Sequence, residues 1–214
     1  AEVYHRKHLP VLVGGTGLYV SSLLSNVQLA PTTQDAALRQ KFLEYAKEHG
    51  NIALHDQLKA LDPEAAAEIH PNNLVRVIRA LEVCTLTGKT FTACKAKSHQ
   101  IPSPYQSLII GLTYERSVLY ERINTRVDQM IEQGMIEEAY HVYQNEALRT
   151  AYHAIGYKEL IPYFEKKMPL QACIDKIKQE SRHYAKRQLT WFRRVDGIQW
   201  VETDKFDSFQ KIIE

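Results

Sequence analysis

The stretch LPVLVGGTGLYVSSLL, residues 9–24, decides the fold class of this chain. It predicts a short apolar strand over residues 11–13, a turn built as Gly14-Gly15-Thr16-Gly17, and a helix over residues 18–24. A wholly apolar strand is typical of a parallel sheet that is covered on both faces. We therefore expect an α/β fold.

The glycine turn has two possible roles. A strand that runs into a glycine-rich turn and a helix N-terminus forms a natural anion site, because backbone N–H groups are exposed and the helix dipole favours negative charge. Glycines also allow the backbone to approach a ligand closely. The alternative is a plain tight turn whose glycines serve only to reach positive φ.

Composition points to an ordinary globular protein. The chain has 214 residues, of which 44% are hydrophobic and 24% are charged. No apolar run approaches the roughly 18 residues that a membrane span needs. Three cysteines without CxxC spacing (Cys84, Cys94 and Cys173) suit a reduced, cytoplasmic protein and argue against a structural zinc site.

The order of the predicted elements suggests a helical insertion in an α/β core. Helices are predicted over residues 33–50 (capped at Thr33), 52–61, 62–70 and 72–88, followed by a loop over 90–106. A second buried strand follows within 107–114, then a long helical region broken near Gly134, a helix over 170–192 and a strand over 197–203. We expect a core of residues 1–30 and 105–214 and a helical insertion domain of residues 31–104.

Two features at the ends of the predicted helices carry further expectations. Residues 1–8 read as the last turns of a helix, and the strand at 11–13 has few predicted neighbours, so we expect sequence to precede residue 1.

The TGKT at residues 87–90 resembles the end of a Walker A loop. Val83 occupies the required glycine position, however, and a helix rather than a strand precedes it.

Positive charge is concentrated near the C-terminus. The formal net charge is only +2, but residues 176–194 contain seven Lys or Arg and a single acidic residue, Glu180. Such a basic stripe is the footprint expected for a polyanion partner.

Five segments together resemble the tRNA dimethylallyltransferases. LPVLVGGTGLYVSSLL, NNLVRVIRALEV, RINTRVDQMIEQGMIEEA, AIGYKEL and AKRQLTWFRR occur here in the order seen in that family. The resemblance implies a P-loop-kinase-like parallel-sheet core with a mostly helical insertion domain. It implies transfer of a dimethylallyl group from dimethylallyl diphosphate to N6 of adenosine 37 in the anticodon stem-loop of tRNA. It also implies Mg²⁺, a cytoplasmic location and a monomer.

The family begins with a strand, a P-loop and a catalytic aspartate that this sequence does not contain. We therefore expect the general base and the magnesium ligands to lie outside this chain, and the chain alone to be incomplete for catalysis.

The resemblance assigns catalytic roles to two positions. Thr16 lies in the family's glycine motif at the reaction centre, and Arg126 resembles the arginine that grips the diphosphate. An arginine fork suits a leaving diphosphate because it binds bidentately and stabilises the growing charge. Arg122, one helical turn earlier, and the backbone of Gly14, Gly15 and Gly17 complete the expected diphosphate site. For the arginines the alternative is a solvated helix charge.

Three further segments are expected to contact tRNA. In each, cations or aromatic side chains suit phosphate contacts and base stacking. The alternatives are surface charges on an amphipathic helix and aromatic rings packed inward. The expected tRNA contacts are Val75, Arg76 and Arg79; His153, Gly156, Tyr157 and Lys158; and Arg182, Lys186, Arg187, Gln188, Trp191 and Arg193.

Two other functions remain open at this point. One is an adenylate prenyltransferase that acts on a free nucleotide, although a small substrate needs neither a helical insertion nor a basic stripe. The other is a non-catalytic tRNA-binding fragment.

Overall fold

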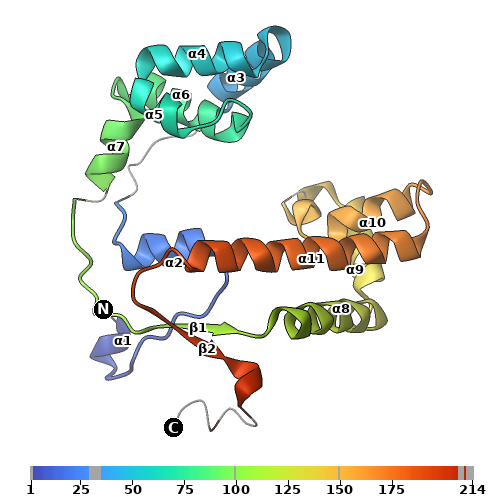
Figure 1. Cartoon of the computed structure of the whole chain (residues 1–214). Helices are drawn as coiled ribbons and strands as arrows, with labels where there is room; N and C mark the ends of the chain where they lie inside the picture. The colour runs from blue at the N-terminus through green and yellow to red at the C-terminus, as the bar shows by residue number, and fades with distance from the viewer. Residues whose placement is uncertain (1, 29–34, 99, 149, 207–209, 211–214) are drawn as a thin grey trace. The chain divides into compact units, whose positions relative to one another are not determined.

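The computed structural model describes residues 2–28, 35–98, 100–148, 150–206 and 210. The chain divides into two compact units, whose elements are labelled in Figure 1. Unit 1 joins Ala1–Leu18 to Ser107–Glu214, and unit 2 is Tyr19–Gln106. The observed boundaries thus fall near residues 18 and 107, and helix α2 (Gly17–Leu24) crosses the first of them.

Unit 1 combines a small parallel sheet with helices. Helices α8 and α11 pack against each other, as Figure 1 shows, and α10 packs on both α9 and α11. The mixed α/β class is confirmed. The elements of unit 1 are α1 (Glu2–His5), β1 (Ile109–Thr113), α8 (Arg116–Glu132), α9 (Met135–Gln144), α10 (Tyr157–Phe164), α11 (Leu170–Phe192) and β2 (Ile198–Glu202), with three short 3-10 turns.

Strands β1 and β2 pair in parallel, with Ile109 opposite Ile198 and Thr113 opposite Glu202. Gly111 lies opposite Trp200, and a Cβ at Gly111 would come within 2.7 Å of the indole. The predicted strands within residues 107–114 and over residues 197–203 are confirmed as β1 and β2. The predicted burial of β1 is wrong, because Ile110 and Leu112 are 54% and 60% exposed. Neither strand has a second neighbour among the described residues, so these side chains are left uncovered.

The predicted strand over residues 11–13 is wrong. These residues are in no regular element, and Val11 and Val13 are 77% and 87% exposed. A strand requires a neighbour for its backbone hydrogen bonds. Among the described residues, β1 and β2 pair with each other, and residues 11–13 pair with neither open edge of this sheet.

The core of unit 1 lies where α8, α9, α10 and α11 meet. Gly134, at φ 98°, separates α8 from α9, which confirms the predicted break. The predicted helix over residues 170–192 is confirmed at both ends. The buried residues of this core are Val127, Ala139, Leu160, Cys173, Ile174 and Ile177.

The regular elements among the described residues of unit 2 are all helices. Its elements after α2 are α3 (Ala36–His49), α4 (Asn51–Leu61), α5 (Pro63–Glu68), α6 (Leu74–Thr87) and α7 (Phe91–Ser98). The predicted cap Thr33 lies outside the described residues, and the side chain of Asp35 caps α3 by accepting a hydrogen bond from the Leu38 amide at 3.0 Å. The predicted helix over residues 72–88 is confirmed as α6, and Gly88 caps its end in the left-handed conformation.

Helix α7 corrects the predicted loop over residues 90–106. The Thr90 hydroxyl accepts a hydrogen bond from the Ala93 amide at the start of the helix, and Phe91 packs against the core of unit 2. Asp62, which caps α5 through the Ala65 amide, also accepts hydrogen bonds from the amide and hydroxyl of Thr92 at 2.8 and 3.0 Å. These tertiary bonds outweigh the polar composition that suggested a loop.

Candidate functional site

The glycine turn lies against the last turns of α11. The side-chain amide of Gln188 donates a hydrogen bond to the carbonyl oxygen of Gly15 at 3.0 Å. A Cβ added at Gly15 would overlap that amide, and one added at Gly17 would overlap the indole of Trp191. None of the turn glycines is among the residues with positive φ. The alternative of a turn that needs positive φ is therefore wrong. The absence of side chains at Gly15 and Gly17 instead allows the Gln188 amide and the Trp191 indole to approach the turn closely.

Thr16 stands at the exposed tip of this turn, directly before α2. Its hydroxyl makes no hydrogen bond to another described residue, so it is available to a ligand. Its predicted catalytic role stays a prediction.

Helix α8 carries the two arginines expected at the diphosphate. Both are exposed. The guanidinium of Arg122 lies 4.7 Å from the centre of the Tyr114 ring, in a cation–π contact that restrains it. Arg126 makes no ion pair or hydrogen bond with any residue that the structure describes, so its fork is free for an anion.

The basic stripe divides into a paired half and a free half. Lys178 contacts Asp128 at 2.6 Å, and Lys176 lies 3.4 Å from Glu180. Arg182 donates to the side chain of Asn124 at 2.5 Å. These three side chains hold α11 together or tie it to α8, so the predicted tRNA contact of Arg182 competes with a bond inside the protein.

The free half forms what we call the basic hollow. It is an open depression of about 480 Å³, and no carboxylate of the described residues pairs with its Lys or Arg side chains, whereas the ring of His183 lies 3.5 Å from Glu180. It is lined by His183, Lys186, Arg187, Thr190, Trp191 and Arg194. Arg187 lies 5.8 Å from the ring centre of Tyr184. Arg193, which is also exposed and has no ion pair with a described residue, follows just beyond.

Three members of the basic hollow were not predicted: His183, Thr190 and Arg194. His183 and Thr190 lie four and three residues from Arg187, so the face of a helix over residues 170–192 already implied these two. Arg194 lies four residues after Thr190, just beyond the end of that helix. Tyr114, which restrains Arg122, carried no signal in the sequence because it follows a strand and meets the arginine only through folding.

The loop before α10 is held mainly by contacts within the protein. Gly156, at φ 106°, donates its amide hydrogen bond to Glu159 at 2.7 Å. The ring of Tyr157 packs against the core, and its hydroxyl donates to Glu138 at 2.7 Å, a bond that raises the pKa of the Tyr157 phenol. His153 and Lys158 are exposed. The position of Tyr157 therefore favours the inward-packed alternative over base stacking.

In unit 2, the predicted tRNA residues of α6 differ in their freedom. Val75 is 81% exposed, and Arg76 is exposed without an ion pair among the described residues. Arg79 lies 3.5 Å from the fully buried carboxylate of Glu82, which Arg39 binds with two hydrogen bonds of 3.0 and 2.9 Å. Arg79 therefore helps to neutralise a buried charge.

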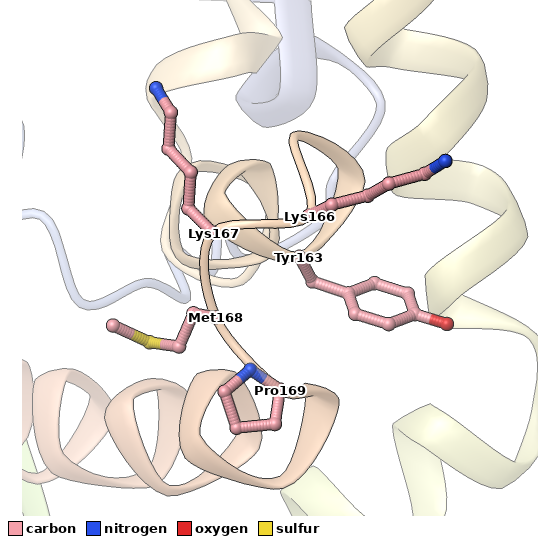
Figure 2. A pocket seen from close by; sticks show the side chains of 5 residues that line it. All are labelled: Tyr163, Lys166, Lys167, Met168 and Pro169. Atoms are coloured by element: carbon pink, nitrogen blue, oxygen red, sulfur yellow. The ribbon is translucent and has the colours of Figure 1, made fainter.

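A second depression, of about 360 Å³, lies at the turn between α10 and α11. Figure 2 shows its lining residues, with Lys166 and Lys167 extending in different directions. Lys167 pairs with Glu165 at 2.8 Å. No predicted site residue lines it, and its cations do not converge on one point.

The described residues offer neither a metal-binding cluster nor a membrane-spanning helix. No group of three or more His, Cys, Asp or Glu there could hold a metal ion. No described helix is both long and apolar enough to cross a bilayer.

Trp191 joins the two parts of the site, because its indole lines the basic hollow and also covers Gly17. The arrangement is that of an α/β protein suited to a polyanion beside a glycine-rich turn.

A family model described as IPP transferase matches residues 1–195, and the chain belongs to that family.

Curated relatives agree with the family model. The chain is 47% identical over 215 residues to the tRNA dimethylallyltransferase of Halalkalibacterium halodurans, covering 100% of this chain and 68% of the relative. It is 41% identical to the tRNA dimethylallyltransferase of Acetivibrio thermocellus, covering 69% of that protein. The chain thus spans about two thirds of the length of these relatives.

Solved structures are similar as well. The full-length tRNA isopentenylpyrophosphate transferase from Bacillus halodurans superposes with a TM-score of 0.64 at 45% identity, over 99% of this chain and 66% of that one. A eukaryotic dimethylallyltransferase acting on tRNA gives a TM-score of 0.78 at 26% identity, over 99% of this chain and 57% of that one.

Proposed function

We propose that the protein transfers a dimethylallyl group from dimethylallyl diphosphate to N6 of an adenosine in tRNA. Family membership supports the class of reaction. The observation that carries the choice of an RNA substrate is the basic hollow, which Trp191 joins to the glycine turn. A continuous cationic and aromatic surface beside a reactive turn suits a nucleotide that is presented by a larger polyanion.

In this reaction the N6 nitrogen attacks C1 of the dimethylallyl group as the bond from C1 to the diphosphate oxygen breaks. The diphosphate leaves with the electron pair of that bond, and N6 loses a proton to a base. Arg126, whose guanidinium is free, would stabilise the charge that grows on the diphosphate, with Arg122 beside it. The Thr16 hydroxyl, which can donate and accept, would bind the target nucleotide or the diphosphate.

No described residue is assigned as the base or as a metal ligand. Mg²⁺ usually keeps several waters and binds through substrate phosphates and one or two carboxylates. A magnesium requirement would therefore enter with the diphosphate. The proposal also places the protein in the cytoplasm as a monomer.

The experiment that tests this function offers two acceptors to the complete native protein, together with labelled dimethylallyl diphosphate and Mg²⁺. One acceptor is an anticodon stem-loop with an adenine in its loop, and the other is free AMP. We expect label in the RNA and none in AMP. Label in AMP alone would identify an adenylate prenyltransferase, and RNA binding without transfer would identify a non-catalytic binding protein.

A further inference from the structure

We propose that Gln188 is a positioning residue for the reaction centre rather than an RNA contact. Its amide holds the backbone of the glycine turn and thereby fixes the place of Thr16. This inference rests on the proposed function for its catalytic consequence, but the structural link between Gln188 and the turn stands by itself.

The glycine turn has little other support. Among the described residues, the bond from Gln188 to the Gly15 carbonyl is the one side-chain hydrogen bond made to residues 9–16. The preceding residues do not pack as a strand, since Val11 and Val13 are 77% and 87% exposed. The placement of Thr16 therefore depends on what α11 supplies.

Helix α11 supplies that support from one face. Gln188 and Trp191 are three residues apart and share this face. Both meet the turn, Gln188 at Gly15 and Trp191 at Gly17, so closely that neither glycine has room for a Cβ. The basic hollow uses the neighbouring face, through residues such as Lys186 and Thr190. Gln188 does not line the hollow and is half-buried.

A hydroxyl that must meet a reacting group needs a fixed backbone, because displacement by about 1 Å costs on the order of 100-fold in rate. Gln188 donates to the carbonyl oxygen of Gly15, which lies two bonds from the amide nitrogen of Thr16. Loss of the Gln188 amide therefore removes a restraint on the residue that directly precedes Thr16. Helix α11 itself does not depend on this bond, because the Gln188 side chain makes it to the turn and not within the helix. Loss of the amide should thus affect the rate far more than the stability.

The test replaces Gln188 with methionine, which keeps the length of the side chain and removes the donor. Gln171→Met is the matched control, because Gln171 is the same residue type at the exposed start of α11, and Asp175 is the one described residue to which its side chain is hydrogen-bonded. Three quantities are measured for each: the Kd for an anticodon stem-loop, the single-turnover rate with both substrates saturating in the complete native protein, and ¹⁵N relaxation of glycine amides in this chain.

For Gln188→Met we expect a Kd within about twofold of wild type, a single-turnover rate lower by about tenfold, and lower order parameters at Gly15 and Gly17. Gln171→Met should leave all three unchanged. A weaker Kd with an unchanged saturated rate would overturn the proposal and make Gln188 an RNA contact. Unchanged relaxation at Gly15 would show that Gln188 does not hold the turn.

A second variant guards against a folding defect in the first. Gly15→Ala should displace the Gln188 amide from the side of the turn and lower the saturated rate to a similar extent. In a Gln188→Ala background the same change should cost much less, because the amide is gone. Additive losses would overturn the proposal. If the wild-type protein transfers no group at all, the proposed function fails, while the relaxation data still decide whether Gln188 holds the turn.

Discussion

The structure revises the salt dependence of RNA binding that the sequence alone predicts. The sequence shows seven cations in residues 176–194, but three of them are engaged within the protein. The other four have no acidic partner among the described residues and are free for phosphates. They are Lys186, Arg187, Arg193 and Arg194.

Each phosphate contact contributes about 0.7 to 0.9 to the slope of log affinity against log salt. Four contacts therefore contribute a slope of about −2.8 to −3.6, or a loss of roughly 50- to 150-fold in affinity between 50 and 200 mM salt. Replacing all four cations with glutamine should remove most of this dependence. Replacing one of them should lower the magnitude of the slope by a single increment of about 0.7 to 0.9.

Lys178→Gln is the matched control. It removes the same charge from the same helix, but its ammonium group already contacts Asp128 at 2.6 Å and its side chain is only 18% exposed. The slope should stay at the wild-type value. The slope is measured for Lys178→Gln and for Lys186→Gln by filter binding of an anticodon stem-loop at several salt concentrations. An equal fall in slope for Lys178→Gln and Lys186→Gln would refute the division of the stripe into paired and free halves.

Three further predictions concern catalysis and stability. Arg126→Ala in the complete protein should lower kcat by about 100-fold or more while tRNA binding is spared, because the diphosphate charge grows only as the allylic bond breaks; an unchanged single-turnover rate at saturating donor would assign the diphosphate to another cation. Thr16→Val should lower the rate by roughly 5- to 150-fold, the equivalent of about 1–3 kcal/mol for one hydrogen bond, with little change in Tm; wild-type turnover would leave the turn as architecture alone. Burial by itself would raise the pKa of Asp62, but hydrogen bonds from Ala65 and Thr92 outweigh it and lower the pKa below the ordinary value of 3.8, so this stabilisation is complete above that pH and is lost as the pH falls through the lower folded pKa. Asp62→Asn should then unfold more easily at neutral pH and show a shallower loss of stability in acid, measured by urea unfolding at several pH values; parallel pH profiles would contradict this account.

Helix predictions from the sequence succeeded where local signals and apolar periodicity agreed. Pro63 begins α5, Gly88 ends α6 in the left-handed conformation, and Gly134 separates α8 from α9. These residues act through the backbone preferences of proline and glycine, which follow from the residue type alone. The strand prediction for residues 11–13 failed because an apolar run forms a strand only if it pairs with a neighbour, and it pairs with neither described strand.

The site was predictable in its residue types but not in its pairings. The motif around Gln188 was expected to face RNA, yet the amide is bonded to Gly15, which is 173 positions away. Arg79 and Arg182 were expected to be free, and each meets a side-chain oxygen instead, in Glu82 and Asn124. Such contacts depend on the tertiary fold, so a count of charges along the chain overstates the cations available to a ligand.

The product of the reaction tests the central claim most directly. The complete native protein is incubated with dimethylallyl diphosphate, Mg²⁺ and an anticodon stem-loop, the RNA is digested, and the nucleosides are analysed by mass spectrometry. The account predicts one dimethylallyl group on N6 of a loop adenosine and one diphosphate released for each group transferred. Diphosphate release without modified adenosine, or a prenyl group on any other atom of the RNA, would contradict it.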